Sequence, residues 1–364
     1  MGIQGLGVET LSLVGALAMG LIKGVPWLAE VQTPPPRLPE GAPHLRPLLV
    51  DEEGRPIASL EAWEKHRARI RQRWLEFLGL ERMPSFLPSS FEVLQEERRE
   101  GVRRQLIRYR VEPDLPTEAY LLLPEEEAGP FPGVVVLHST SNETIRQGAG
   151  LGSAPEKAFG WQLARRGVAA ICPRCFLWPS DLEPPETRAL PFPQRVEWFR
   201  ARHPGCRGMA KMLYDARVAL EVLLLVPQVD KNRLGAVGHS LGAKEVLYLA
   251  AFDERIQAAV FSEGGIGLRF SNWDAPWYLG EEVRSPDFPW EHHELLALVA
   301  PRAFLLIGGD SADGSRSWPF IEAVLPVYRL YGGEPRVGLF NHGKGHTVPP
   351  EAQQRMMEWM MAYL

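Results

Sequence analysis

The feature that most constrains the fold is a regular alternation of short apolar runs and longer amphipathic runs between residues 133 and 364. The short runs are typical of buried strands, and the longer ones repeat apolar residues at helical spacing. Such alternation predicts an α/β fold with a mostly parallel, doubly wound sheet and helices on both faces. The predicted strands span residues 133–138, 168–172, 233–238, 256–262, 302–309 and 336–340, and the predicted helices span 156–167, 208–227, 244–251, 292–300, 318–333 and 351–364.

The residues before this alternation follow a different pattern. Between residues 91 and 124 short β-like runs are separated by Gly101 and by the prolines at 113 and 116, which predicts antiparallel strands at a sheet edge. We therefore assign residues 91–364 to one α/β domain. Two long connections, at about 173–207 and 263–291, interrupt it, and loops of that length are usually lids or binding loops.

Residues 1–90 form an N-terminal extension with three parts. An apolar segment is followed by a proline-rich linker at 33–43 and by a predicted amphipathic helix over 59–79 that ends at Gly79. The apolar segment resembles the centre of a signal peptide, but no Lys or Arg precedes it, and it is short for a bilayer. We expect no membrane span and a cytoplasmic protein, with secretion as the alternative if residues 1–30 act as an atypical signal peptide.

Composition limits the kinds of partner. The 364 residues carry a formal net charge of −5 and no basic stripe, which argues against binding to nucleic acid. Three cysteines, at 172, 175 and 206, are too few for a disulfide framework, and a lone C-x-x-C pair is not a zinc signature. We expect a small-molecule partner and neither a metal nor an organic cofactor.

A Gly-x-Ser-x-Gly motif lies where a predicted strand meets a predicted helix. It comprises Gly238, Ser240 and Gly242, and in this context it predicts a nucleophile elbow that projects the serine oxygen into a cleft. The glycines are needed because the sharp turn leaves no room for side chains two residues on either side of the serine. The motif alone is weak evidence, and its position between strand and helix carries the prediction.

A serine hydroxyl is a poor nucleophile until a base takes its proton, so a histidine is required nearby. His346 follows the last predicted strand, in a loop with glycines at 343 and 345. It therefore reaches the same edge of the sheet as Ser240. His342 lies nearer the strand end, and we interpret it as structural.

The third member of such a triad is an acid that orients the imidazole and stabilises its charged form. Asp310 and Asp313 follow the strand at 302–309, and Glu263 follows the strand at 256–262. We expect Asp313 to be this acid, with Asp310 and Glu263 as alternatives. Each choice keeps the chain order serine, acid, histidine.

This order, together with the strand-end positions of the three residues, resembles the α/β-hydrolase superfamily along residues 91–364. More narrowly, the chain is similar to the dienelactone-hydrolase-like and acetyl-xylan-esterase-like branches in the stretches LHST, AAFDERIQAAVFSEGG and PRAFLLIGGDSADG. The resemblance implies a serine esterase that acts through an acyl-enzyme, on acetyl esters of carbohydrates or on small esters. A peptidase of prolyl-oligopeptidase type and a catalytically silent binding protein of the same fold are the alternatives.

The oxyanion of the acyl-transfer intermediate requires two backbone donors. One is the N–H of Leu241, and the other is expected from Ser139 or Thr140 in the loop after the strand at 133–138. His138, at the end of that strand, is a candidate substrate contact, although a hydrogen-bonded strut is the favoured interpretation.

Aromatic residues in the connection at 263–291 are further candidate substrate contacts. Trp273, Trp277 and Tyr278 either stack on a sugar or aryl group or form a small core under a lid. The two interpretations weigh equally at this point.

Overall fold

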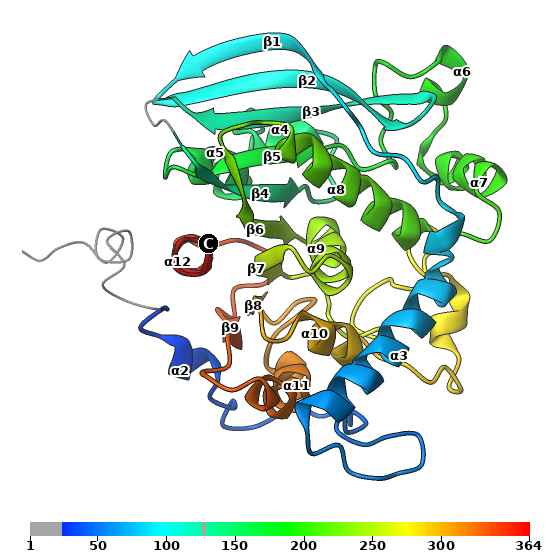
Figure 1. The fold of residues 1–364 in the computed structure, drawn as a ribbon, viewed down its shortest axis with the longest axis vertical. Helices are drawn as coiled ribbons and strands as arrows, with labels where there is room; N and C mark the ends of the chain where they lie inside the picture. The colour runs from blue at the N-terminus through cyan, green and yellow to red at the C-terminus, as the bar shows by residue number, and fades with distance from the viewer. Residues whose placement is uncertain (1–23, 126–128) are drawn as a thin grey trace, which may run out of the picture.

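A computed structural model describes residues 24–125 and 129–364. The signal-peptide-like segment lies almost entirely outside these residues. Within the described part of the chain, nine strands form one sheet in the order β1-β2-β3-β5-β4-β6-β7-β8-β9 (Figure 1). The strands are β1 Glu92–Arg99, β2 Val102–Glu112, β3 Leu115–Pro124, β4 Phe131–Leu137, β5 Ala169–Pro173, β6 Val229–His239, β7 Ile256–Ser262, β8 Ala303–Gly308 and β9 Val337–Asn341.

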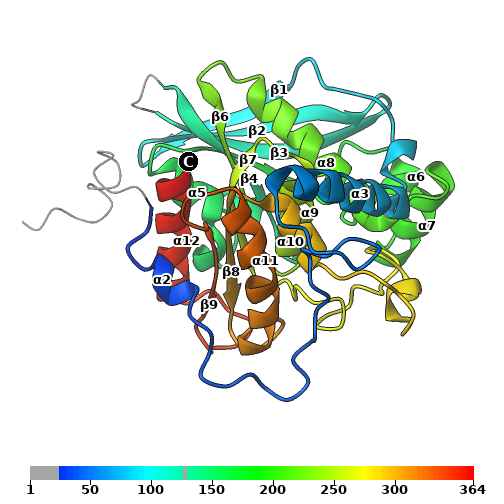
Figure 2. The ribbon, with the colours of Figure 1, turned by 60° about the horizontal axis from the view of Figure 1, so that its bottom comes forward.

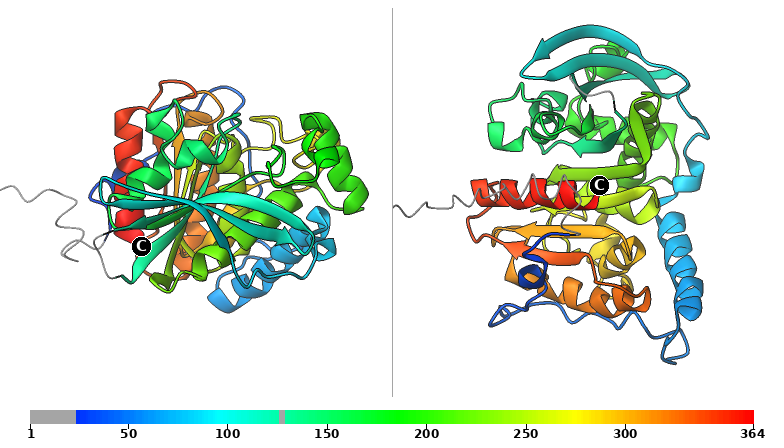
Figure 3. Two further views of the ribbon diagram at one scale, coloured as in Figure 1. Left: turned by 90° about the horizontal axis from the view of Figure 1, so that it is seen from above. Right: turned by 60° about the vertical axis from the view of Figure 1, so that its left-hand side comes forward.

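The type of strand pairing changes once across this sheet. The pairs β1–β2, β2–β3 and β3–β5 are antiparallel, and every pair from β5 to β9 is parallel. The predicted mostly parallel sheet with an antiparallel edge is therefore confirmed. Seen from above in Figure 3, the strands fan out from one another, as twisted open sheets do.

Helices cover both faces of the sheet. Helices α3, α8, α9, α10 and α11 contribute to one apolar core, and α2, α5 and α12 contribute to a second core on the opposite face. The helices are α2 Leu28–Val31, α3 Leu60–Leu78, α4 Ile145–Gly148, α5 Phe159–Ala164, α6 Pro185–Arg188, α7 Phe192–Arg202, α8 Gly208–Leu224, α9 Leu241–Phe252, α10 His293–Val299, α11 Trp318–Leu330 and α12 Pro350–Tyr363. Short 3₁₀ helices are η1 Leu80–Arg82, η2 Pro155–Lys157, η3 Glu281–Arg284 and η4 Ser315–Ser317.

The two long connections differ in structure. The connection at 173–207 contains α6 and α7, helices that the sequence pattern did not predict because prolines and arginines mask their short apolar faces. Proline stands in the first turn of both, where its missing N–H costs no hydrogen bond. The connection at 263–291 contains only η3 and is otherwise irregular.

The N-terminal extension packs along the domain. Helix α3 begins at the Ser59 cap, whose side chain accepts a hydrogen bond from the backbone of Ala62, and ends at Gly79 in the left-handed conformation. Trp74 of α3 donates from its indole to Glu294 at 2.8 Å, which ties α3 to α10. Further upstream, the Gln32 side chain donates to two carbonyls beside β9 and so satisfies part of that sheet edge. Figure 2 shows α2 beside β9 and α12.

In the part of the chain that the structure describes, no helix combines the length and apolarity needed to cross a membrane.

Candidate active site

Ser240 lies at the sharp turn between β6 and α9. Its backbone has φ 60° and ψ −119°, a conformation that non-glycine residues rarely adopt. A Cβ atom built on Gly238 would lie 2.3 Å from the backbone of Gly242, and one on Gly242 would lie 2.1 Å from the carbonyl oxygen of Leu137. The turn therefore has the geometry of a nucleophile elbow, with its strain and its crowding both present.

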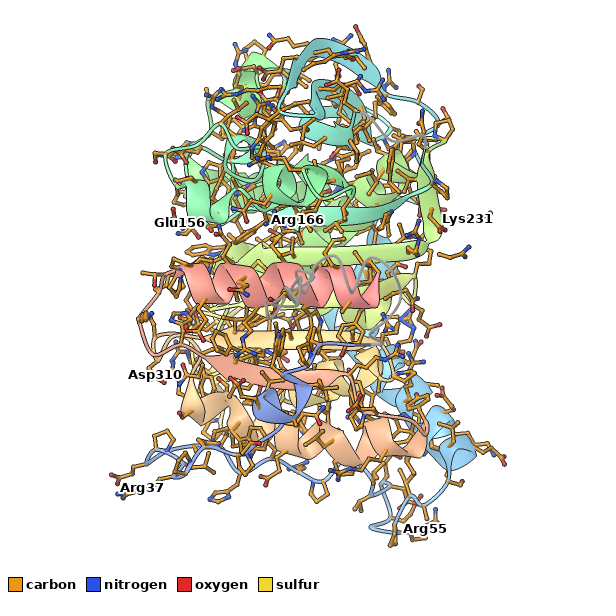
Figure 4. All side chains as sticks on the ribbon, turned by 90° about the vertical axis from the view of Figure 1, so that its left-hand side faces the viewer. Arg37, Arg55, Glu156, Arg166, Lys231 and Asp310 are labelled. Carbon is orange, nitrogen blue, oxygen red and sulfur yellow. The ribbon has the colours of Figure 1, made fainter. Side chains whose placement is uncertain are left out.

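The elbow is fixed to the neighbouring strand. The amide of Ser240 donates to the carbonyl of Ser262, the last residue of β7, at 2.8 Å. Because β6 and β7 are parallel, the residues that follow both strands emerge at the same edge of the sheet. Figure 4 shows this edge: Asp310, which follows β8, lies on one side of the molecule, and Lys231, near the start of β6, lies on the other.

His346 lies at this edge, in the loop between β9 and α12. Its Nδ1 donates to Oε2 of Glu263 at 3.1 Å. Gly343 and Gly345 both have positive φ, at 63° and 74°, so the loop needs glycine to bring the imidazole into place. The imidazole ring also lies 4.7 Å, centroid to centroid, from the ring of His239, the residue before Ser240.

Glu263 follows β7 directly and is almost fully buried. Besides His346, its carboxylate accepts the backbone N–H of Gly309 and that of Ala312, the latter at 2.8 Å. Its own backbone has φ 53°, a second strained position at the same edge of the sheet. Three donors hold this buried negative charge, which makes Glu263 a rigid partner for the imidazole.

Asp313, the acid that the sequence favoured, is held elsewhere. Its carboxylate accepts hydrogen bonds from the amide of Gly265 at 2.6 Å, from the amide of Ile266 at 2.9 Å and from the hydroxyl of Ser317 at 2.8 Å. Burial raises the pKa of Asp313 to about 6. The structure therefore brings Glu263, rather than Asp313, to His346, because the turn after β7 occupies the oxygens of Asp313.

Asp310, the other alternative, is bonded to its own loop and to the end of β9. Its Oδ1 accepts from the side chain of Asn341, the last residue of β9, at 2.8 Å and from the amide of Ser315 at 3.3 Å. His342, expected to be structural, accepts the amide of Lys344 at its Nδ1 at 3.1 Å. None of these contacts involves His346.

The two loops expected to stabilise an oxyanion meet beside Ser240. Leu241 is the first residue of α9, so its N–H has no acceptor within the helix. The amide of Ser139 donates to the side chain of Gln147 at 3.0 Å, which engages that donor. Thr140 is exposed beside it. Of the two predicted donors after β4, the Ser139 amide is thus engaged by a side chain, whereas Thr140 is an exposed residue.

His138 is a strut and does not face a ligand. Its Nδ1–H donates to the carbonyl of Ser139 at 2.7 Å, and its Nε2 accepts the amide of Cys175 at 3.2 Å. Burial lowers its pKa to about 4, so the ring is neutral and both nitrogens are engaged. The contrary prediction of a substrate contact is not supported by this geometry.

Two of the three predicted aromatic contacts belong to the core. Trp273 is fully buried and donates its indole N–H to the carbonyl of Gly265 at 2.6 Å, and Tyr278 is also buried. Trp277 is partly exposed and packs edge-on against Phe192 at 5.0 Å. Only Trp277 keeps a surface that a ligand could reach without displacing the loop.

Sequence reasoning missed Lys244, one helical turn after Ser240. Its ammonium lies 3.9 Å from the ring centre of Trp273 and 5.0 Å from that of Tyr278, without a hydrogen-bond partner among the described residues. Burial lowers its pKa to about 7. The signal available in the sequence was the charged pair Lys244 and Glu245 inside an otherwise apolar helix, because such residues are rarely buried for structural reasons alone.

The strand order, the elbow and the imidazole–carboxylate pair at one sheet edge together define a protein of the α/β-hydrolase fold. Two comparisons with solved structures agree. A glucuronoyl esterase from Solibacter usitatus superposes with a TM-score of 0.67 at 17% identity, over 90% of this chain and 99% of its own. A "putative acetyl xylan esterase" from Bacteroides fragilis superposes with a TM-score of 0.57 at 18% identity, over 80% of this chain and 84% of its own.

A relative of similar length is also found by sequence. The chain is 25% identical over 315 residues to "Putative hydrolase YtaP" of Bacillus subtilis strain 168, which covers 81% of this chain and 100% of the relative. No protein-family model matches the chain. The chain thus has the α/β-hydrolase fold that its sequence predicted, and it resembles carboxylic ester hydrolases in structure.

Proposed function

We propose that the protein is a serine esterase that cleaves carboxylic esters of carbohydrates through an acyl-enzyme. The observation that carries this proposal is the 3.1 Å hydrogen bond from His346 to the buried Glu263 at the sheet edge where the strained Ser240 turn lies. A nucleophile on an elbow, an imidazole and an orienting carboxylate are the parts that acyl transfer requires.

In the first half-reaction, the hydroxyl oxygen of Ser240 attacks the ester carbonyl carbon while Nε2 of His346 accepts its proton. Collapse of the tetrahedral intermediate breaks the bond to the alcohol, and His346 returns the proton to the leaving oxygen. Glu263 accepts from Nδ1–H, which keeps Nε2 available for the serine and stabilises the imidazolium.

The second half-reaction uses the same groups on water. His346 takes a proton from a water molecule while the water oxygen attacks the acyl carbon. Collapse of this second intermediate breaks the bond to the Ser240 oxygen, His346 returns the proton to that oxygen, and the carboxylic acid is released. We assign the oxyanion in both steps to the amides of Leu241 and Thr140, an assignment supported by the place of Leu241 at the start of α9 and by the exposure of Thr140 after β4. No cofactor is required by this route.

The substrate class follows from the relatives and from the openness of the site. One structural relative is a glucuronoyl esterase and another is named for acetyl xylan. The His346 side chain is 43% exposed, so the imidazole stands at an open rim where a sugar ester attached to a larger molecule can approach. We therefore place esters of uronic acids first and acetyl esters of sugars second.

A labelling experiment tests the proposed nucleophile. A fluorophosphonate probe should modify the wild-type protein at Ser240, as peptide mapping by mass spectrometry would show, and should leave Ser240→Ala unmodified. A protein that stays unlabelled at a saturating probe concentration would instead support the catalytically silent alternative.

A substrate panel tests the reaction class. We expect turnover of methyl glucuronate esters, acetylated xylo-oligosaccharides and p-nitrophenyl acetate, and none of an aminoacyl p-nitroanilide. Amide hydrolysis faster than ester hydrolysis would contradict the proposal and favour the peptidase alternative. The ratio of kcat/KM between the glucuronate and the acetyl esters then ranks the two sugar-ester classes.

A further inference from the structure

His239 has no assigned role, yet it directly precedes the proposed nucleophile in the chain, and its ring lies 4.7 Å from the ring of the proposed base. It is the last residue of β6 and is 1% exposed. From this placement we propose that His239 is a positioning residue, which fixes the ring plane of His346 for proton transfer. The inference rests on the proposed function, because it assigns a task that only the Ser240–His346 reaction requires.

His239 is itself rigidly held. Its Nδ1 lies 3.0 Å from the hydroxyl of Ser262, the residue directly opposite it in the β6–β7 register. Ser262 is fully buried, and its carbonyl accepts the amide of Ser240. His239 and its partner Ser262 thus immediately precede Ser240 and Glu263. Any shift of His239 would disturb both strand ends, so its ring is a fixed surface.

His346 needs such a surface. The hydrogen bond to Glu263 fixes one ring atom, and a ring held at one atom can still pivot about that bond. The loop that carries His346 contains two glycines with positive φ, and the side chain is 43% exposed, so solvent offers little restraint on the other side. The ring of His239, at 4.7 Å and tilted by 43°, supplies the second contact that defines the plane.

The chemistry of the His239 ring suits this task. Its Nε2 is buried and has no hydrogen-bond partner among the described residues. Burial first, and then the positive potential of His346, Lys157 and His342, hold the pKa of His239 well below its ordinary value. A neutral ring adds no charge next to His346 when that imidazole becomes protonated. Its lowered pKa also makes it a weaker base for the proton of the serine than an ordinary histidine.

Substitutions at position 239 separate the ring from its hydrogen bond. His239→Ala removes both, His239→Asn keeps a group that can bond Ser262, and His239→Phe keeps only the aromatic face. His293→Phe is a matched control, because His293 is also buried, makes one ring hydrogen bond and has one unpartnered nitrogen, at the start of α10. For each variant, kcat and KM on p-nitrophenyl acetate, the rate of fluorophosphonate labelling and the melting temperature are measured.

We expect His239→Ala and His239→Asn to lower kcat and the labelling rate by about ten- to a hundredfold at nearly unchanged KM, the size of a small misplacement of a reacting group. His239→Phe should recover kcat to within about threefold of the wild type, because the ring face orients His346. His293→Phe should lower the melting temperature about as much as His239→Phe does, with no change in kcat.

The outcomes decide between the two proposals. A folded His239→Ala variant with wild-type kcat would overturn the positioning role. If the Ala variant does not fold, equal kcat values for His239→Phe and His239→Asn would overturn it as well. A wild-type protein that neither hydrolyses esters nor reacts with the probe would instead contradict the proposed function. The wild-type measurement therefore separates failure of the chemistry from failure of the positioning role.

Discussion

His346 and Glu263 are hydrogen-bonded at 3.1 Å although they are 83 positions apart in the chain and lie after strands that are not neighbours. Strand β8 lies between β7 and β9, and its following loop donates two backbone N–H groups to the same carboxylate. Glu263 thus follows β7, its carboxylate accepts two N–H groups of the loop after β8, and it also accepts a hydrogen bond from His346 in the loop after β9. The ends of three adjacent strands are therefore needed to place Glu263 as the hydrogen-bond partner of His346.

This relationship predicts which acid variant loses activity. Glu263→Gln should lower kcat on p-nitrophenyl acetate by about 10⁴-fold, because the amide favours the wrong imidazole tautomer and cannot stabilise the charged ring. Asp313→Asn should stay within about tenfold of the wild type. Asp310→Asn, an exposed acid of the same loop, is the control and should be nearly unchanged. The assignment is wrong if Asp313→Asn is the inactive variant.

Asp313 should instead contribute to the pH dependence of the unfolding free energy. Burial raises its folded-state pKa to about 6 from an ordinary value near 3.8, so the folded protein holds this proton more tightly than the unfolded chain. The associated stability is complete below about pH 4 and is lost as the pH rises through 6. We expect the unfolding free energy of the wild type, relative to Asp313→Asn, to fall by about 2 to 3 kcal/mol between pH 4 and 7.

Urea unfolding of both proteins at these two pH values measures that difference. Subtracting the variant cancels the titration of other groups to first order, so only position 313 contributes. A difference that stays constant across the range would show that Asp313 is ionised at no cost in the fold.

The elbow makes a prediction about packing. Gly242→Ala should strongly destabilise the protein, because the new Cβ would lie 2.1 Å from the carbonyl oxygen of Leu137. Gly332→Ala is the control: its φ of 72° is unfavourable for alanine, whereas the helical Gly242 has no positive φ, and no atom lies within 4 Å of the Cβ added at position 332. It should cost only the left-handed strain of about 1 to 2 kcal/mol. Equal melting temperatures for the two variants would show that α9 moves away from β4 without cost.

Lys244 should lower the stability of the folded state at neutral pH. Its folded-state pKa is lowered to about 7, mainly by burial, while the unfolded lysine titrates near 10.5. Between these values the unfolded chain binds a proton that the folded chain does not, so stability decreases as the pH falls from 10.5 to 7. Lys244→Met should therefore be more stable than the wild type at pH 7, by about 3 kcal/mol, and this advantage should shrink toward pH 10.

Thermal and urea unfolding at pH 7 and pH 10 check this expectation. The control is Lys231→Met, since Lys231 is exposed and its substitution should change stability little at either pH. If Lys244→Met is less stable than the wild type at pH 7, the ammonium gains more from Trp273 and Tyr278 than burial costs it.

The prediction that Ser240 and His346 share one edge of the sheet depends only on their positions along the chain. Ser240 and His346 both follow strands, and parallel strands deliver such residues to one edge whatever the details of the loops. The choice among acids depended instead on which carboxylate oxygens were already used. Asp313 accepts two amides of the turn at 265–266, a pairing that no local pattern encodes.

The burial of Trp273 and Tyr278 could not be predicted from the sequence either. Trp273 and Tyr278 stand beside the exposed-looking residues of a long connection, but the loop folds back and encloses them. Helix α7 was missed for a related reason, since its apolar side is short and becomes recognisable only where Phe199 meets Phe176.

The sequence by itself determined the sheet, the helical layers and the serine turn, because periodicity and steric limits on glycine positions act between residues close in the chain. Tertiary structure alone decided which carboxylate pairs with His346, that the Ser139 amide is engaged by Gln147, and the contact of His239 with His346. These depend on hydrogen bonds and ring contacts between strand ends that are distant in sequence. A buried polar group forms its hydrogen bond with whichever partner the packing brings next to it, and local sequence does not encode that partner.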